Sequence, residues 1–415
     1  MTDTLTPQRQ VAIGLVLLAA AGTFALTMGA RQSMGLFLGT INSSTGLGLG
    51  SISLAFAFGQ LWWGLTQPFA GMVADRVGAG RVIFLGVLLV AGGTALIPFM
   101  HTTWGLILAI GMLAAGGAGM AGPSVMMAAT TRLIPAEKRG MATGIVNAGG
   151  SFGQFLFAPL AQGITAAAGW VVALQSLAAI TLLALPAAWI LRGNSRHLAA
   201  KAAPGAKAQT TRQAIAEALR NPSYRLLSLG FFVCGFHVAF IATHLPGVVA
   251  ACQLPPSVGA WSLGILGLFN IVGSLAMGWA ISFQGGRWRM KSLLSLVYAV
   301  RAVAVALFMV APKTEFTFFA FAAVIGVSYL STVPPTAGLV AKFFGPANMA
   351  TLFGVVMLAH QLGGFLGAYL GGKAFEWTGS YDWMWYADIV LAVGAALVHM
   401  PIREASKPRL ASATA

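Results

Sequence analysis

Charged residues are scarce in this chain: only 8% of its 415 residues are Asp, Glu, Lys or Arg, whereas 58% are hydrophobic. A soluble domain of ordinary composition carries about 25% charged residues, because it must cover a surface that faces water. Long hydrophobic runs instead follow one another along the whole chain. The composition therefore excludes a soluble globular protein and indicates a protein embedded in a lipid bilayer.

Cysteine and catalytic motifs are also scarce. The two cysteines, Cys234 and Cys252, allow at most one disulfide, and Cys234 lies inside a hydrophobic run. The chain has no HExxH pair and no cluster of Cys, His and Asp, and its serines lack an evident base and orienting acid. We therefore expect no metal, no cofactor and no enzyme activity.

The hydrophobic runs have the length of membrane-spanning helices. A hydrocarbon core of about 30 Å needs roughly 20 helical residues. The runs predict an all-α polytopic protein with twelve transmembrane helices, at residues 11–38, 51–74, 82–100, 104–130, 140–167, 170–191, 225–250, 259–281, 291–311, 316–340, 348–374 and 383–402.

Acidic residues are fewer than basic ones, nine against 24, which gives a net charge of +15. If the loops alternate from a cytoplasmic N-terminus, 20 of the 24 Lys and Arg residues fall on the cytoplasmic side, as the positive-inside rule requires. The basic excess therefore reflects topology and needs no nucleic-acid partner. We expect both termini to be cytoplasmic and the protein to lie in a bacterial inner membrane.

The chain divides into two halves that resemble each other. The one long polar stretch, residues 192–224, separates six predicted spans (1–191) from six others (225–415) and reads as a cytoplasmic linker. Similar segments recur about 210 residues apart in the same order: GMVADRVGAGR with GWAISFQGGRWRMK, GPSVMM with PPTAGL, and ATGIVNAGGSFGQF with TLFGVVMLAHQLGGF. Repeated six-helix halves are typical of secondary transporters, whose substrate site lies between the halves near the membrane midplane.

The segment GMVADRVGAGR resembles the loop signature of the major facilitator superfamily, which follows the second helix. The matching residues are Gly71, Asp75, Arg76, Gly78 and Arg81. The resemblance covers all twelve spans and implies two pseudo-symmetric six-helix bundles, a loop that gates the cytoplasmic side, and alternating access. In the second copy Ser282 stands where the aspartate is expected. We expect a monomer.

A second segment points to a subfamily. KRGMATGIVNAGG, residues 138–150, resembles the start of the fifth helix in monocarboxylate and oxalate/formate-type carriers. The acidic-glycine-aromatic signature of the first helix of the monocarboxylate carriers is replaced by MGARQSMG, residues 28–35. The resemblance implies a small carboxylate as substrate.

Arg31 lies inside the first predicted span, where an unpaired arginine costs about 3 kcal/mol on insertion scales. A structural role would need a buried acid, and the spans offer almost none: Asp75 falls in the gating loop, and Asp388 is expected near the outer part of the last span. A guanidinium without a protein counter-ion can be balanced by an anionic ligand, which it holds bidentately if that ligand is a carboxylate. We therefore expect Arg31 to bind the substrate.

Further polar side chains within the spans are candidates for the same site. They are His237, His360, Asn147, Gln154, Asn270 and Tyr329. Each has an alternative structural role, because polar groups in membrane helices often hydrogen-bond a neighbouring helix. For Arg301 we expect an internal hydrogen-bonded role near Tyr298 or Asn270.

These observations predict a secondary transporter of a small organic anion. His237 and His360 would bind a proton in a symport, whereas anion exchange needs only an arginine that stays charged. Efflux of amphipathic compounds is the main alternative, although a carrier of cationic drugs would be expected to place an acid in its cavity. A membrane sensor derived from a transporter is an alternative of another class.

Overall fold

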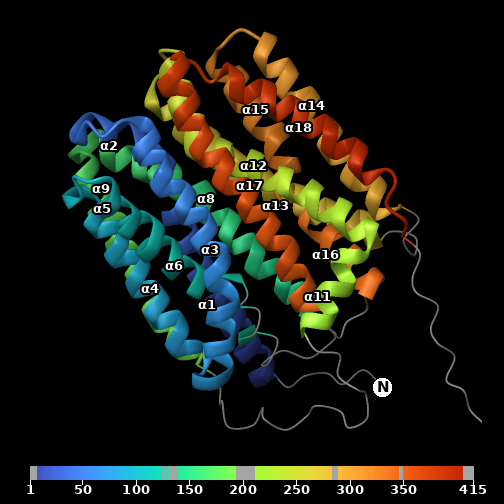
Figure 1. Ribbon diagram of the computed structural model, residues 1–415. Helices are drawn as coiled ribbons and strands as arrows, with labels where there is room; N and C mark the ends of the chain where they lie inside the picture. Colours follow the sequence, from blue (N-terminus) through green and yellow to red (C-terminus); the bar gives the residue numbers. More distant parts are fainter. Residues whose placement is uncertain are drawn as a thin grey trace, which may run out of the picture.

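The computed structural model describes residues 7–123, 125–126, 129–130, 139–192, 211–282, 288–344 and 349–404. These residues form a bundle of helices without any strand (Figure 1). Within this part of the chain, nine helical segments are long and apolar enough to cross a membrane. The predicted all-α fold is confirmed, and each predicted span overlaps with helical residues.

The helices of the first half are α1 (Pro7–Gln32), η1 (Met34–Phe37), α2 (Leu38–Thr45), α3 (Leu49–Val77), α4 (Ala79–Leu96), η2 (Ile97–Phe99), α5 (Thr103–Leu106), η3 (Ile107–Ala114), α6 (Ala115–Met120), α8 (Arg139–Ala168), α9 (Trp170–Leu182) and α10 (Leu185–Ile190). Those of the second half are α11 (Thr211–Arg220), α12 (Pro222–Ala251), α13 (Pro256–Ser282), α14 (Met290–Val310), α15 (Glu315–Ser328), α16 (Val333–Phe344), α17 (Met349–Thr378) and α18 (Asp382–His399).

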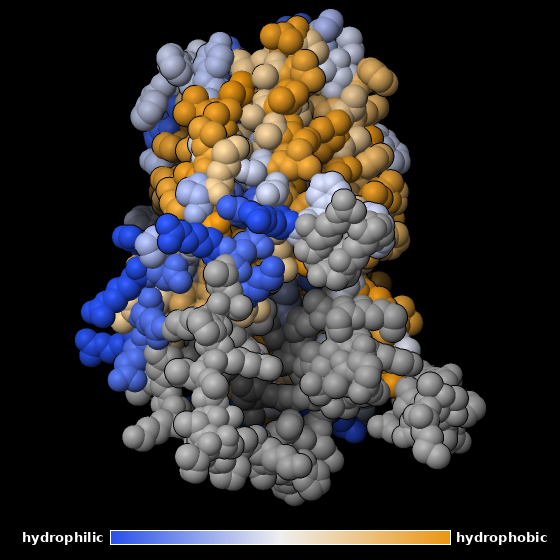
Figure 2. Space-filling model, turned by 90° about the vertical axis from the view of Figure 1, so that its right-hand side faces the viewer, coloured by the Kyte–Doolittle hydropathy of each residue, from blue (hydrophilic) through white to orange (hydrophobic). Residues whose placement is uncertain are grey.

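The outer surface is apolar where it would meet lipid. Figure 2 shows a broad hydrophobic area on one face of the molecule, bordered on one side by hydrophilic side chains. Large apolar side chains such as Leu18, Val310 and Val390 are at least 70% exposed. In water such a surface would drive aggregation, whereas in a bilayer it is solvated by lipid tails.

The tenth predicted span, residues 316–340, is interrupted. It falls on two helices, because α15 ends at Ser328 and α16 begins at Val333. Pro334 and Pro335 explain the break, since neither has a backbone N–H to donate to the preceding turn. Discontinuous helices are tolerated within membranes only where other groups satisfy the freed backbone.

Glycines allow the helices to approach closely. In α17, a Cβ at Gly363 would meet the backbone of Phe232 in α12, and one at Gly367 would meet that of Phe236. Small residues at such contacts are the usual means of packing helices in membranes. Helix α17 also packs against α3, and α13 packs against α8, so helices of the first half meet helices of the second half along both pairs (Figure 1).

We expect Gly363→Ala to destabilise the protein by about 1–3 kcal/mol, because the added methyl group would force α17 away from the Phe232 carbonyl. Gly354→Ala is the matched control, since it lies in the same helix and its Cβ would meet nothing within 4 Å. The control should be neutral or stabilising, because alanine favours helix over glycine. Thermal unfolding of both variants in detergent decides, and equal melting temperatures would contradict the packing.

Candidate functional site

Arg31 lies near the end of α1, and its side chain reaches α3. The guanidinium donates a hydrogen bond from Nη2 to Oε1 of Gln60 at 2.5 Å, and its central carbon lies 4.8 Å from the centre of the Trp63 ring. Among the described residues, no acidic side chain forms an ion pair with Arg31. A neutral amide and an aromatic face hold the arginine in place without neutralising its charge.

A small cavity of about 40 Å³ lies beside this arginine. Arg31, Gln60 and Thr94 line it from the first half, and Ala242 and Thr243 of α12 line it from the second half. This volume is of the order that one or a few water molecules need. The cavity lies between the halves beside Arg31, and in this conformation it has room for little more than water.

Tyr329 brings the second half to the same arginine. It lies in the break between α15 and α16, is 1% exposed, and interacts electrostatically with Arg31. Its hydroxyl donates to the carbonyl of Val238 at 2.9 Å. The proton of the Tyr329 hydroxyl therefore already has an acceptor within the protein.

Arg301 holds the interrupted helix together. Its Nη2 donates to the carbonyl of Tyr329 at 2.7 Å and also to the carbonyl of Ser328, and its guanidinium lies 5.3 Å from the Tyr298 ring. The last carbonyls of a helix have no partner within it and carry partial negative charge, which a cation stabilises. These contacts agree with the expected internal hydrogen-bonded role of Arg301 near Tyr298. The acceptors are backbone carbonyls at the helix break.

Asn270 bridges three segments at the same break. Its amide nitrogen donates to the Ser151 hydroxyl of α8 at 2.9 Å, and its amide oxygen accepts from the Leu330 backbone N–H at 3.0 Å. The bonds connect α8, α13 and the irregular residues between α15 and α16. In this conformation Asn270 is occupied by structural hydrogen bonds.

The two polar residues predicted on α8 have different surroundings. Gln154 is 1% exposed, and its amide nitrogen has no hydrogen-bond partner among the described residues. Asn147, two turns earlier, is exposed. Gln154 is therefore available to a ligand or a water molecule in the interior, whereas the structure does not bring Asn147 to the Arg31 cavity.

His360 lies on α17 within an aromatic and thiol environment. Its ring centre is 4.8 Å from that of Phe231, and its Nδ1 has no hydrogen-bond partner among the described residues. Cys234 lies beside it and beside Thr332, whose hydroxyl is 3.2 Å from the sulfur. The imidazole is buried in the second half, and it does not line the Arg31 cavity.

His237 has a neighbour that we did not expect from the sequence. Its Nε2 lies 3.4 Å from Oδ1 of Asp388, and both side chains are buried. From the sequence we expected Asp388 near the outer part of the last span, and we did not predict that this acid would be buried against His237. Hydropathy gives the depth of Asp388 only roughly, and it does not show that α18 turns this residue toward α12.

The residues of the predicted gate lie where α3 meets α4. Gly78 has a φ of 95°, which favours glycine and lets the chain turn between the two helices. Arg76 and Arg81 are exposed, and the side chain of Asp75 lies outside the described residues. A Cβ at Gly71 would meet nothing within 4 Å in this conformation. The gating role stays a prediction.

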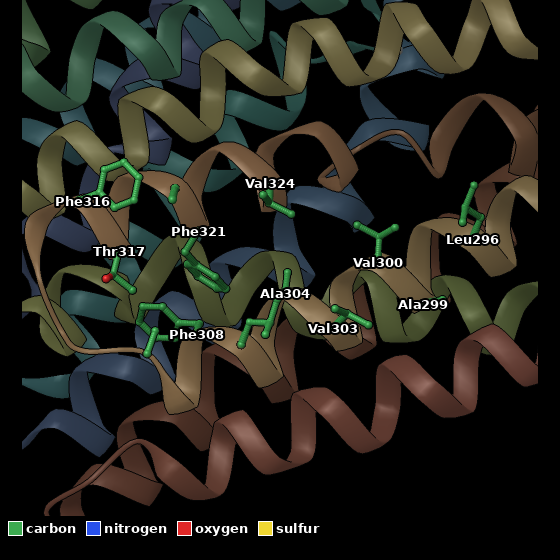
Figure 3. A pocket seen from close by; sticks show the side chains of 13 residues that line it. Leu296, Ala299, Val300, Val303, Ala304, Phe308, Phe316, Thr317, Phe321 and Val324 are labelled. Carbon is green, nitrogen blue, oxygen red and sulfur yellow. The ribbon is translucent and has the colours of Figure 1, made fainter.

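A larger groove lies on the outside of the second half. It has a volume of about 600 Å³, and Figure 3 shows that side chains of α14 and α15 such as Leu296, Val300 and Phe316 line it. These three side chains are exposed, and Thr317 is the one side chain in the lining that carries a polar atom. The groove therefore has no charged side chain in its lining.

Comparisons with known proteins agree with this architecture. Residues 15–311 match the model of the Major Facilitator Superfamily. The chain is 25% identical to monocarboxylate transporter 13 of Rattus norvegicus over 390 residues, covering 93% of this chain and 88% of that protein. It is 24% identical to the oxalate:formate antiporter of Oxalobacter formigenes over 363 residues, covering 85% and 83%.

A solved structure shows the same fold. The crystal structure of the nucleoside transporter NupG (D323A mutant) superposes with a TM-score of 0.76 at 14% identity, covering 94% of this chain and 99% of that one. At this identity the likeness shows the fold alone. Together with the family match, it establishes that this chain is an integral membrane protein that belongs to the major facilitator superfamily.

Proposed function

We propose that this chain is a secondary transporter that carries a small organic anion, of the monocarboxylate kind, across a bacterial inner membrane. The observation that carries the proposal is Arg31, a guanidinium at a cavity between the halves whose described neighbours leave its charge uncompensated. Two of the relatives are named for monocarboxylates and for oxalate and formate, which supports an anionic substrate.

The contacts between helices of the two halves support alternating access. In this proposal the bundles formed by 1–191 and 225–415 rock about the Arg31 cavity, the linker 192–224 joins them, and both termini are cytoplasmic. At the outer end, the Gly50 backbone N–H of α3 donates to Glu376 of α17 at 2.9 Å, which supports a conformation closed on that side. The loop with Asp75 and Arg76 then acts as the gate on the cytoplasmic side. The carrier works as a monomer.

Efflux of cationic compounds would need an uncompensated acid. Asp388 is buried beside His237, and the permanent positive charge of Arg301 acts on its carboxylate. Arg31, in contrast, carries a positive charge that no acidic side chain among the described residues balances. The charges within the fold therefore favour an anion over a cation as the transported species.

A binding screen of the purified protein tests the proposal. We expect formate, acetate, L-lactate, pyruvate or oxalate to raise the melting temperature, since a ligand at 100 times its Kd stabilises the folded state by about 2.7 kcal/mol. Stabilisation by tetraphenylphosphonium and by none of the anions would contradict it. Counterflow of the stabilising anion in proteoliposomes then separates a transporter from a sensor, which binds without exchange.

A further inference from the structure

A buried acid and imidazole form a pair in the second half, separate from the Arg31 cavity. Asp388 lies on α18 and His237 on α12, with 3.4 Å between Oδ1 and Nε2. The exposed fractions of the two side chains are 1% and 4%. In the part of the chain that the structure describes, Asp388 is the one buried acidic residue.

The pair lacks the hydrogen bonds that would fix its charge. Neither carboxylate oxygen of Asp388 has a hydrogen-bond partner among the described residues, and the same holds for Nε2 of His237. Burying an isolated carboxylate is costly, so such a group takes up a proton or is balanced by a nearby cation. The separation of 3.4 Å exceeds the roughly 2.7–2.9 Å of a charge-assisted hydrogen bond, so the two groups are not locked as an ion pair.

The helices packed against α18 contribute further ionisable groups, which lie around Arg301 of α14 and Cys234 of α12. These are Tyr298 on α14 and His360 on α17, and His399 of α18 itself stacks on Tyr298. Arg301 carries the permanent charge in this set, and it interacts electrostatically with both Asp388 and His237. When a proton leaves the pair, Arg301 balances the carboxylate that remains.

We propose that Asp388 and His237 form the proton-binding site of this carrier and make it a proton–anion symporter. The inference rests on the proposed anion transport and assigns its coupling ion. A proton passes from water to the pair on one side of the membrane and returns to water on the other side, while Arg31 holds the anion.

A count of buried charges explains why the two species travel together. With Arg31 and Arg301 positive and Asp388 negative, the carrier that holds neither anion nor proton has a net interior charge of one positive unit. Binding one anion and one proton leaves that sum unchanged, whereas either one alone changes it. Charge within a bilayer is expensive. The empty and the fully loaded carrier have the same net charge, so they meet the same electrostatic cost on reorienting.

Infrared spectroscopy tests the proton site without any substrate. A neutral-minus-alkaline difference spectrum of the wild-type protein is expected to show a protonated carboxyl band that disappears in Asp388→Asn and persists in Asp382→Asn. Asp382 is the matched control, because it lies on the same helix but is exposed. His237→Gln should keep the band and shift the pH at which it vanishes. A wild-type spectrum without the band, or a band that survives Asp388→Asn, would overturn the assignment.

Transport in proteoliposomes tests the coupling, with whichever carboxylate of the binding screen stabilises the protein most. An inward proton gradient is expected to drive accumulation by the wild type and by Asp382→Asn. Asp388→Asn should lose at least about tenfold of this accumulation and still exchange labelled anion. Accumulation by Asp388→Asn at the wild-type level would overturn the inference.

The outcomes distinguish the two proposals. Wild-type counterflow without any response to the proton gradient would overturn the symport and leave anion transport standing. Absence of both counterflow and anion binding in the wild type would overturn the proposed function, while the infrared result would still decide whether Asp388 holds a proton.

Discussion

Replacing Arg31 with glutamine is expected to weaken the binding of a transported carboxylate at least about tenfold and to stop its counterflow, because a charge-assisted hydrogen bond contributes about 1.5–3 kcal/mol. Arg31→Lys should bind with intermediate affinity, since lysine keeps the charge and loses the planar fork that matches a carboxylate. Binding is measured by isothermal titration with the carboxylate that the screen selects.

The neighbour of Arg31 offers a second variant that does not touch the arginine. Gln60→Glu changes the acceptor of the Arg31 hydrogen bond into a carboxylate, which would compete with the anion for the guanidinium. We expect this variant to lose affinity as Arg31→Gln does. Arg225→Gln serves as the control, because Arg225 is exposed at the start of α12 and should bind like the wild type. Unchanged affinity in a folded Arg31→Gln protein would refute the role of Arg31.

The helices could be predicted from the sequence, because hydropathy and length define the spans and because in a membrane every backbone group must be satisfied within a helix. It also singles out Arg31, since a cation within an apolar run is exceptional. Pro334 and Pro335 indicate the break between α15 and α16, but our prediction of one span, 316–340, did not take them into account.

The partners of the polar residues could not be predicted in the same way. His237 and Asp388 are far apart in the sequence, and no local pattern states that α12 and α18 turn these two side chains toward each other. Asn147 and Gln154 share a face by their spacing of two turns, yet one is exposed and the other buried. Spacing gives the face of a helix, whereas burial depends on how far the neighbouring helix extends along it.

A second large effect, on stability, is expected at Arg301 of α14. Arg301→Met is expected to destabilise the protein by roughly 3 kcal/mol, because the carbonyls of Ser328 and Tyr329 would lose their donor and each unsatisfied buried acceptor costs about 1–3 kcal/mol. Arg301→Lys should recover part of this loss, since an ammonium can reach one carbonyl. Thermal unfolding in detergent measures both, with Arg225→Met as the exposed control.

A double variant separates the two possible reasons for this arginine. If Arg301 mainly completes the broken helix, Asp388→Asn will not rescue Arg301→Met, because the carbonyls remain without a donor. If Arg301 mainly balances Asp388, removing the carboxylate will restore most of the lost stability, as expected when an uncompensated buried charge is the cause. We expect the first result, because Arg301 donates hydrogen bonds to the backbone at the break and interacts with Asp388 only electrostatically. Substantial rescue would mean that Arg301 mainly balances the charge of Asp388 and does not mainly complete the broken helix.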